Sequence, residues 1–527
     1  MKPEQVKVLL TTLGAILFNV IFWQQKLGIN IVFFDVFILS SVFYLYPVSF
    51  KKSATKWLLA GHIITVAAVI IHNVMLSKLA FSTTLLLIIV FIQYQHRSVW
   101  YAAGSAFINY ALMAPTFFTS IKQIKKGKLT FYSFRKTLRF LVIPTLLLLV
   151  FLFLYNISNS IFSGIINYVG LALQQFFLRF FDWFSWPRFW FLLLGLFITG
   201  GLLLKSNIHY FSQKDITRHD ALNRKKTGLV KWRETSWYQL LALVMGKLAN
   251  GTMALRNENK TGIISLILLN ILLLCINCID IVYVWFGFKY NNYINLAAYV
   301  HEGIGMLIFS IVLAMALVLF FFRGNLNFYK KNKLLRFGAY AWLVQNMVLV
   351  ISVLLRDYYY IVHMGLAYKR IGVLVFLILV LFGLMTVFIK IQQLKTTYFL
   401  IRVNAWFAII ILVGASCIHW DEQIAIYNLA RKNTIPIDIT FLLSLSAKTL
   451  PIIEANNDVL DKYSTSRIDK EGEMFYKSQL SPKEVFEMRK KDFIKEQAGY
   501  TWLSWNYADE YVSKHLSKTV TVAVTIQ

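Results

Sequence analysis

Two long apolar segments of this 527-residue chain each carry an acidic residue, Asp280 in the first and Glu302 in the second. A carboxylate in hydrocarbon is costly unless it has a partner or water. Each acid lies about one and a half to two turns from the same end of its predicted helix, so both are expected near one membrane face. The sequence therefore predicts a polar cluster at that depth.

Further charged residues are predicted at the same depth on neighbouring helices. One interpretation pairs the acids with arginines, which holds the helices together. The other is a site for a proton, an ion or a small anionic solute, since ionisable groups inside membranes often mark pathways. The candidate polar cluster comprises Asp280, His301, Glu302, Arg356 and Arg370, with Asp357 and His363 beside the two arginines.

Motifs for other chemistry are missing from the sequence. It contains no phosphate-binding loop, no G-x-S-x-G nucleophile elbow, and no second histidine that would complete a zinc motif with His301-Glu302. Cys275 and Cys278 form a C-x-x-C pair inside an apolar run, where packing is the simpler interpretation. We therefore expect no catalytic residues, cofactor or metal. A membrane enzyme, with His301, Glu302 and His363 in acid–base roles, is the third alternative.

The composition indicates that lipid is the main solvent of the chain. Hydrophobic residues make up 58% of it, its mean hydropathy is +0.59, and its net charge is +29. The last 108 residues hold 14 Lys and Arg against 15 Asp and Glu, so the basic excess belongs to the apolar part. Basic loops between apolar runs are typical of the cytoplasmic side, where anionic lipids are the expected partner. A nucleic-acid partner is not expected.

The predicted fold class is all-α, a polytopic transmembrane helix bundle of about 11 spans, within about 10 to 12, followed by a small extracytoplasmic helical module. Either 79–95 or 98–118 is expected to be interfacial or re-entrant, because five apolar runs precede residue 121 where the basic loops require four crossings. Residues 156–186 carry a polar stripe and are interpreted as an interfacial helix. The alternative is a span, which would reverse the topology upstream.

The expected organisation follows these spans and loops. It comprises N-terminal transmembrane hairpins (1–120), a basic loop, span, interfacial helix and span (121–204), a basic cytoplasmic loop (205–260), a core transmembrane bundle (261–419) and a C-terminal helical module (420–527). Lone polar residues inside the spans, among them Asn270, Gln345 and Asn404, are interpreted as interhelical hydrogen bonds.

Capping signals predict the helices of the C-terminal module. Asp438 is expected to cap one helix that runs up to Pro451. Ser481-Pro482-Lys483-Glu484 is a capping box with proline at the first helical position, and it predicts a long helix from Pro482 to about Leu516. Residues 455–480 are predicted to be a linker.

Several motifs resemble a family of bacterial multipass membrane proteins of unknown function, DUF4173, which is related to DUF4153. The motifs are LRNENKTG, YVHEG, RDYYYIVHMGLAYKR, NLARKNTIPIDITFLLSLSAKTLP and TWLSWN. The resemblance covers roughly residues 255–516, and the first 250 residues only by hydropathy. The sequence departs from the family pattern at Ala367, where threonine is expected, and at Lys448, where an acidic residue is usual. The positions that match best are Arg256, Glu258, Glu302, Gly303, Arg356, Tyr360, Gly365, Leu366, Arg370, Asn428, Arg431, Asp438, Leu443, Pro451, Trp502 and Asn506.

The family label names no activity, so two functions are carried forward. The first is a non-enzymatic envelope scaffold or signalling protein of the bacterial cytoplasmic (inner) membrane, whose extracytoplasmic tail, residues 420–527, binds an envelope protein. The alternative is a transporter of a proton or small anionic solute that uses the polar cluster.

Overall fold

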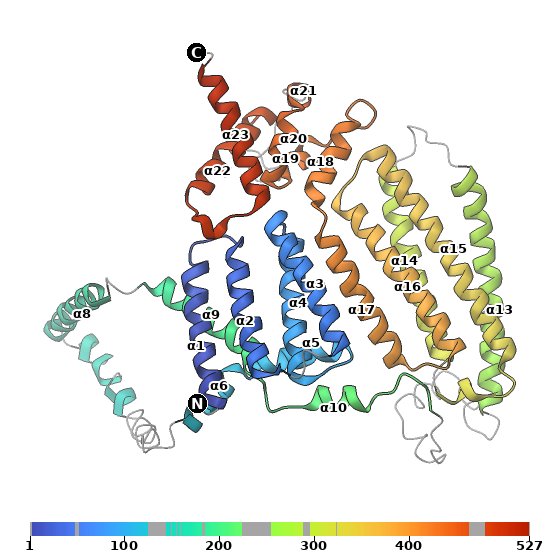
Figure 1. The fold of residues 1–527 in the computed structure, drawn as a ribbon, viewed down its shortest axis with the longest axis horizontal. Helices are drawn as coiled ribbons and strands as arrows, with labels where there is room; N and C mark the ends of the chain where they lie inside the picture. Colours follow the sequence, from blue (N-terminus) through green and yellow to red (C-terminus); the bar gives the residue numbers. More distant parts are fainter. Residues whose placement is uncertain are drawn as a thin grey trace. The chain divides into compact units, whose positions relative to one another are not determined.

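The computed structural model describes residues 3–47, 52–124, 144–181, 185–223, 254–287, 296–322, 324–462 and 480–525, apart from positions 149, 154 and 159. These residues form helices and one isolated bridge, without a strand, so the predicted all-α class is confirmed (Figure 1). Eight of the described helices are long and apolar enough to cross a membrane, and four shorter helices are also apolar. The total of about eleven spans stays a prediction.

The chain forms two compact units, residues 1–52 with 104–209 and residues 53–103 with 210–527. The first unit contains α1 (Pro3–Phe22), α2 (Asn30–Leu45), α6 (Met113–Ile124), α8 (Ser160–Phe181) and α9 (Trp186–Leu203). Within this unit, helices α1 and α9 pack closely against each other. A Cβ added at Gly14 would lie 2.4 Å from Thr199, and one at Gly195 would lie 2.8 Å from Phe18. Glycine at these positions allows the two helices to pack.

The sequence leaves open whether the segments 98–118 and 156–186 cross the membrane, and the structure gives the helices in each. The apolar run 98–118 is divided between α5 (Val99–Ala111) and α6, and neither is long enough to span a bilayer alone. The polar-striped segment 156–186 contains α8 as one helix. Its interfacial placement stays a prediction. Of the loop 205–260, the structure describes α10 (Tyr210–Thr217) and the start of the next long helix, whereas residues 224–253 lie outside the described residues.

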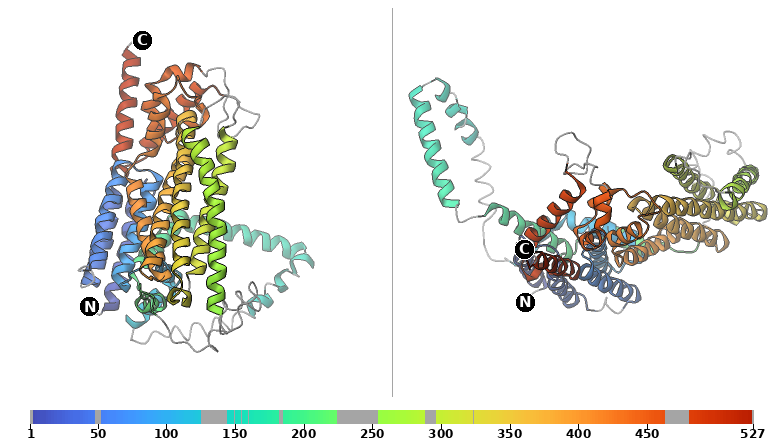
Figure 2. Two further views of the ribbon diagram at one scale, coloured as in Figure 1. Left: turned by 90° about the vertical axis from the view of Figure 1, so that its right-hand side faces the viewer. Right: turned by 90° about the horizontal axis from the view of Figure 1, so that it is seen from above.

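The long helices of the second unit run side by side (Figures 1 and 2). They are α3 (Ser53–Ile71), α4 (Met75–Tyr94), α13 (Ala254–Asp280), α14 (Leu296–Phe321), α15 (Lys333–Met364), α16 (Tyr368–Gln392) and α17 (Thr397–Ser416). α15 contacts α13, α14 and α16, whereas α17 contacts α3, α4 and α16. Buried leucine and valine side chains such as Leu343, Val350 and Leu377 fill the core between α13 and α16.

Polar side chains inside the spans join neighbouring helices, as predicted. Gln345 of α15 donates to Asn270 Oδ1 of α13 at 3.0 Å, and Asn404 of α17 donates to Thr386 Oγ1 of α16 at 2.8 Å. In lipid, where no hydrophobic effect drives helices together, such hydrogen bonds and close packing hold the bundle.

The C-terminal module, residues 420–527, is a set of short helices around its own apolar core. They are α18 (Trp420–Ala430), α19 (Ile439–Ser444), η5 (Ala447–Thr449), α20 (Leu450–Glu454), α21 (Asn457–Lys462), α22 (Pro482–Ala498), η6 (Trp502–Ser504) and α23 (Tyr507–Thr525). Leu442, Leu450, Phe486 and Leu516 are buried in this core, which also includes Ile371 of α16. α21 forms within the predicted linker, and residues 463–479 lie outside the described residues.

Both caps predicted in the module are confirmed, but both helices are shorter than expected. Asp438 accepts a hydrogen bond from Phe441 N at 2.9 Å, yet α19 ends at Ser444 and Pro451 lies in the first turn of α20. The Ser481–Glu484 capping box starts α22, which ends at Ala498. The predicted continuous helix to Leu516 was wrong, because Asn506 accepts from Asp509 N at 3.0 Å and starts a separate helix, α23.

Candidate functional site

The turn between α15 and α16 is held by a side chain of the C-terminal module. Asn428 of α18 accepts from Leu366 N at 2.6 Å and donates to Leu366 O at 3.0 Å. Gly365 beside it has φ of +84°, and a Cβ there would lie 2.6 Å from Asn428 Oδ1. The backbone conformation and the contact with Asn428 therefore both require glycine.

Arg370 caps the C-terminal end of α15 from the first turn of α16. Its guanidinium donates to Met364 O at 2.9 Å and to Gly365 O, and its Cζ lies 4.0 Å from the centre of the Tyr360 ring. A cation at a helix C-terminus satisfies carbonyls that lack intrahelical donors and interacts favourably with the helix dipole. The main partners of Arg370 are thus backbone carbonyls and an aromatic face.

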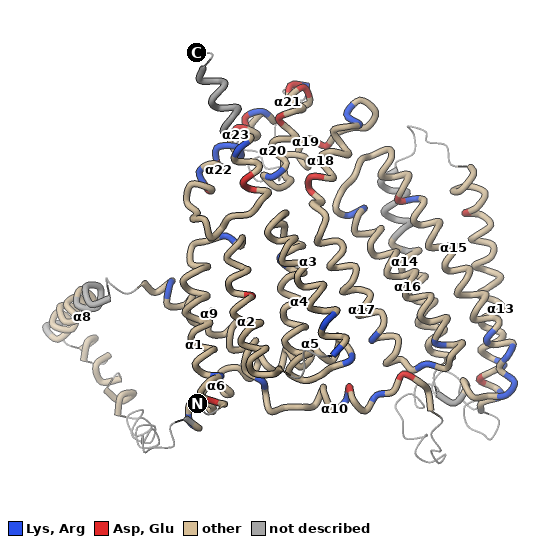
Figure 3. Tube along the Cα trace, in the orientation of Figure 1, with Lys and Arg blue, Asp and Glu red and all other residues tan. Residues whose placement is uncertain are grey.

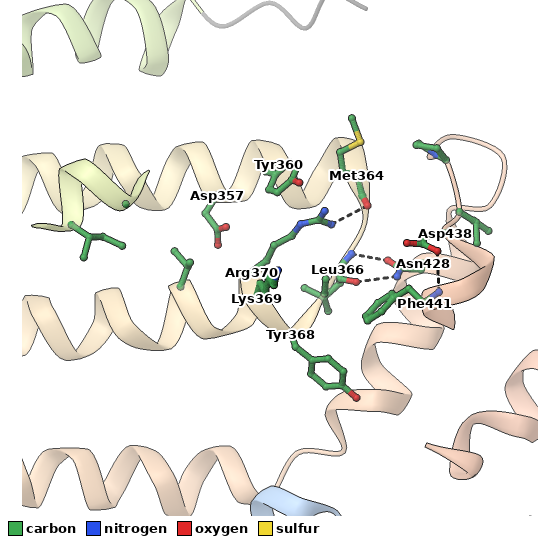
Figure 4. A pocket seen from close by; sticks show the side chains of 16 residues that line it. Asp357, Tyr360, Met364, Leu366, Tyr368, Lys369, Arg370, Asn428, Asp438 and Phe441 are labelled. Atoms are coloured by element: carbon green, nitrogen blue, oxygen red, sulfur yellow. Dashed lines mark hydrogen bonds between the residues drawn. The ribbon is translucent and has the colours of Figure 1, made fainter. Parts of the chain in front are cut away.

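A cavity of about 630 Å³ lies where the ends of α14, α15 and α16 meet the module (Figure 4). Its lining comprises Gly305, Ile308, Asp357, Tyr360, Met364, Leu366, Ala367, Tyr368, Lys369, Arg370, Val373, Asn428, Pro436, Ile437, Asp438 and Phe441. In Figure 4 the Asp357 side chain points from α15 into the space toward α16, whereas the Arg370 guanidinium points toward Met364. The cavity therefore has a carboxylate in one wall and charged side chains of both signs around it.

Asp280 and Arg356 form an ion pair between the ends of α13 and α15. The Arg356 Nη2 to Asp280 Oδ1 distance is 2.5 Å, and Asp280 is only 3% exposed. α13 continues beyond Asp280 as a π-helix, Ile281–Phe286, in which Trp285 Nε1 donates to Ser352 Oγ of α15 at 2.8 Å. These two contacts fasten the wider π-helical turn to α15.

Of the predicted polar cluster, the structure describes the side-chain contacts of Asp280, Arg356 and Arg370. Asp280 contacts Arg356, while Arg370 caps α15 next to the cavity. His301 and Glu302 belong to α14, and their side chains lie outside the described residues.

The sequence prediction missed Asn428 and Tyr360 as members of a site and placed Asp357 only beside the arginines. The motifs that carry the family resemblance were the available signal. Five of their best-matching positions line the cavity, namely Tyr360, Leu366, Arg370, Asn428 and Asp438.

A second polar centre lies where α10 meets the loop after α4 and the first turn of α17. The carboxylate of Asp215 in α10 accepts from His96 Nδ1 at 2.9 Å, from Arg97 N at 2.7 Å, from Ser98 N at 3.3 Å and from Tyr398 OH at 2.6 Å. Burial alone would raise the pKa of Asp215, but hydrogen bonds from His96, Tyr398 and the two amides together lower it below its usual value of 3.8. Asp215 therefore ties α10, the loop after α4 and α17 together.

The module also contacts the turn after α3. Lys448 Nζ donates to His72 O and to Asn73 O, each at 2.6 Å, and so caps the C-terminal end of α3. An acidic residue at this position could not donate to these carbonyls. Trp420 Nε1 adds a hydrogen bond to Ala415 O at 3.0 Å, which joins α18 to α17.

The described residues contain no group of three His, Cys, Asp or Glu side chains placed to hold a metal ion. The fold, in which eight of the described helices are long and apolar enough to cross a bilayer, defines a multipass membrane protein. A family model described as a domain of unknown function, DUF4153, matches residues 14–456, which is most of the chain, so the protein belongs to this family. The match extends into the N-terminal half, beyond the resemblance over 255–516. No curated protein and no solved structure matches the chain.

The ion pair predicts a large effect of removing one partner. Asp280→Asn leaves the Arg356 guanidinium without its carboxylate in a buried position, so we expect a loss of about 3–5 kcal/mol in the free energy of unfolding. Asp280→Leu combined with Arg356→Leu should recover most of this loss. The thermal unfolding midpoint in detergent measures both effects, and a wild-type midpoint for Asp280→Asn would contradict the role of the pair.

The centre at Asp215 predicts a pH-dependent attachment of α10. Because its folded-state pKa is depressed, its contribution is complete above the unfolded value of 3.8 and is lost as pH falls through the lower folded value. Asp215→Asn should cost about 1–3 kcal/mol at pH 7 and remove this acid dependence. Proteolysis near α10 across a pH series measures it. Equal acid sensitivity in wild type and variant would show that Asp215 is not responsible.

Proposed function

We propose that this protein is a non-enzymatic scaffold or regulatory protein of the bacterial cytoplasmic (inner) membrane that binds an envelope protein through its C-terminal module. The observation that carries the proposal is an aromatic surface on that module. Trp502, Trp505, Tyr507 and Tyr511 are 66%, 41%, 57% and 56% exposed. Tryptophan and tyrosine supply much of the binding energy at protein interfaces, and large side chains of this kind are otherwise usually packed.

The aromatic surface has a rigid base, which favours recognition of a partner. Thr501 accepts from Leu503 N and starts η6, and Asn506, which is 1% exposed, caps α23. Tyr507 and Tyr511 are one turn apart on α23 and so share a face. Presenting aromatic side chains on a fixed backbone lowers the entropy lost on binding.

The attachment of the module to the spans supports a regulatory role. Asn428, Lys448 and Trp420 each bond a backbone group at the end of a different long helix. A partner bound to the module would therefore act on a part of the chain that is fastened to α3, α15 and α17. This gives a physical route by which binding outside the bilayer could affect the helices.

The distribution of charge supports an extracytoplasmic module and anionic lipid at the basic loops. Figure 3 shows Lys and Arg gathered at the ends of α13, α15, α16 and α17 that lie away from the module. Under the positive-inside rule these ends are cytoplasmic, and the module is then outside. The motifs of residues 255–516 also lead us to infer a close relation to DUF4173.

Transport of a proton or small anion through the predicted cluster has less support. Arg356 contacts Asp280, and Arg370 donates to Met364 O and Gly365 O. An anion would have to compete with these contacts, so we favour the scaffold.

Photo-crosslinking in intact cells tests the proposal. Benzoylphenylalanine at Trp502 or Tyr507 of the full-length protein should yield one discrete protein adduct. Lys491 is the matched control, since it is exposed and belongs to α22, outside the segment 502–511 that carries the aromatic surface, and it should yield none. Combining Trp505→Ser with Tyr511→Ser should weaken the adduct at Tyr507 at least about tenfold, because both residues are expected to contact the partner.

Quenching by brominated lipids distinguishes a protein partner from the membrane surface. If brominated lipids quench Trp502 and Trp505 and no protein adduct forms, the aromatic surface is a lipid anchor and the partner proposal fails.

Cysteine labelling tests the orientation of the module. A cysteine at Lys491 should react with a membrane-impermeant maleimide in intact cells, whereas one at Lys331 should react only after permeabilisation. The reverse labelling would refute the orientation.

A further inference from the structure

The cavity beneath the module contains a buried carboxylate that the protein leaves partly unsatisfied. Asp357 is 1% exposed, and no hydrogen-bond donor among the described residues reaches its Oδ2. A buried carboxylate without a partner is unfavourable by several kcal/mol in an apolar environment. A cationic group in the cavity would remove this cost.

Arg370 of the neighbouring helix α16 lines the same cavity, but its hydrogen bonds go elsewhere. Its Nη1 donates to Met364 O and Gly365 O, and its guanidinium stacks on Tyr360. Figure 4 shows this side chain turned away from Asp357. The two residues thus lie on the same cavity without the direct ion pair that Asp280 and Arg356 form.

The charged residues of the lining are balanced in sign. Asp357 and Asp438 are acidic, whereas Lys369 and Arg370 are basic. Asp438 already caps α19, and Lys369 is an exposed residue at the start of α16. Asp357 and Lys369 are therefore the two charged groups that the fold does not use for capping. They favour a ligand that carries one charge of each sign.

We propose that this cavity binds a zwitterionic aminoalkyl phosphate, with its ammonium group at Asp357 and its phosphate at Lys369. The volume of about 630 Å³ suits a small organic ligand, and Ile308, Val373 and Phe441 supply apolar walls. The cavity lies at the ends of apolar helices, so the ligand is either the headgroup of an aminophospholipid or the free compound in solution. This inference does not depend on the envelope partner.

Two experimental arms separate the two sources. Phosphoethanolamine is titrated into the full-length protein in nanodiscs of phosphatidylglycerol, and the thermal unfolding midpoint is also compared between nanodiscs with and without phosphatidylethanolamine. Glycerol phosphate, which lacks the ammonium group, is the control compound. Saturable binding of phosphoethanolamine assigns a free ligand, and stabilisation by phosphatidylethanolamine alone assigns a lipid.

Variants of the lining test the binding mode. Asp357→Asn should weaken binding at least about tenfold, since it removes the buried counter-charge, and Lys369→Gln about threefold, since that lysine is exposed. Asp215→Asn, a buried aspartate at the other end of the unit, should not change ligand binding. A steric variant provides a second test, which does not depend on whether Asp357→Asn folds.

Gly305→Leu is that steric variant. A Cβ at Gly305 meets nothing within 4 Å, so a larger side chain enters the cavity without a clash at its first carbon. Gly414→Leu on α17 is its matched control, because Gly414 is also open and does not line the cavity. Loss of binding in Gly305→Leu but not in Gly414→Leu supports the proposal. The proposal would be overturned if the wild-type protein bound neither phosphoethanolamine nor phosphatidylethanolamine. It would also be overturned if Asp357→Asn kept the wild-type affinity.

Discussion

Lipid cannot donate hydrogen bonds to the carbonyl groups that a helix leaves open at its C-terminal end, and the junction between spans and module is organised around this constraint. Arg370 satisfies the end of α15, and Lys448 satisfies the end of α3. Asn428 bonds both backbone groups of Leu366 in the turn that follows α15. Two of these three side chains come from the module, so satisfying the helix ends also attaches the module.

The same constraint explains why Asp357 differs from Asp280. Arg356 contacts Asp280 at 2.5 Å, and this pair holds α13 to α15. Arg370 instead donates to two carbonyls, so Asp357 has no such ion pair among the described residues, although Oδ2 lacks a donor in both aspartates. The arrangement that fixes the turn therefore also leaves a carboxylate without a direct ion pair beside the cavity. The proposed regulatory role of the module and the proposed ligand site would both rest on this arrangement.

Sequence reasoning recovered the helical fold, the presence of several long apolar helices and the individual caps, because these depend on local composition and spacing. It joined α22 to α23 because apolar residues continue past Gly499, whereas the break depends on the Asn506 contact with Asp509. For the site, the prediction that Asp280 and Arg356 lie at the same depth in the membrane was enough to place them near each other. The role of Arg370 could not be predicted, since it requires knowing that α15 ends at Met364 and which carbonyls are left open there.

The most direct test of the account is hydrogen–deuterium exchange of residues 362–370 in the full-length protein. In wild type the Leu366 amide should be protected by Asn428, and Asn428→Ala should accelerate its exchange about fivefold, the effect of losing roughly 1 kcal/mol of hydrogen bonding. Asn404→Ala, which removes a contact between α16 and α17 instead, should leave this segment unchanged. Equally fast exchange in wild type and Asn428→Ala would contradict the claim that the module holds the α15–α16 turn.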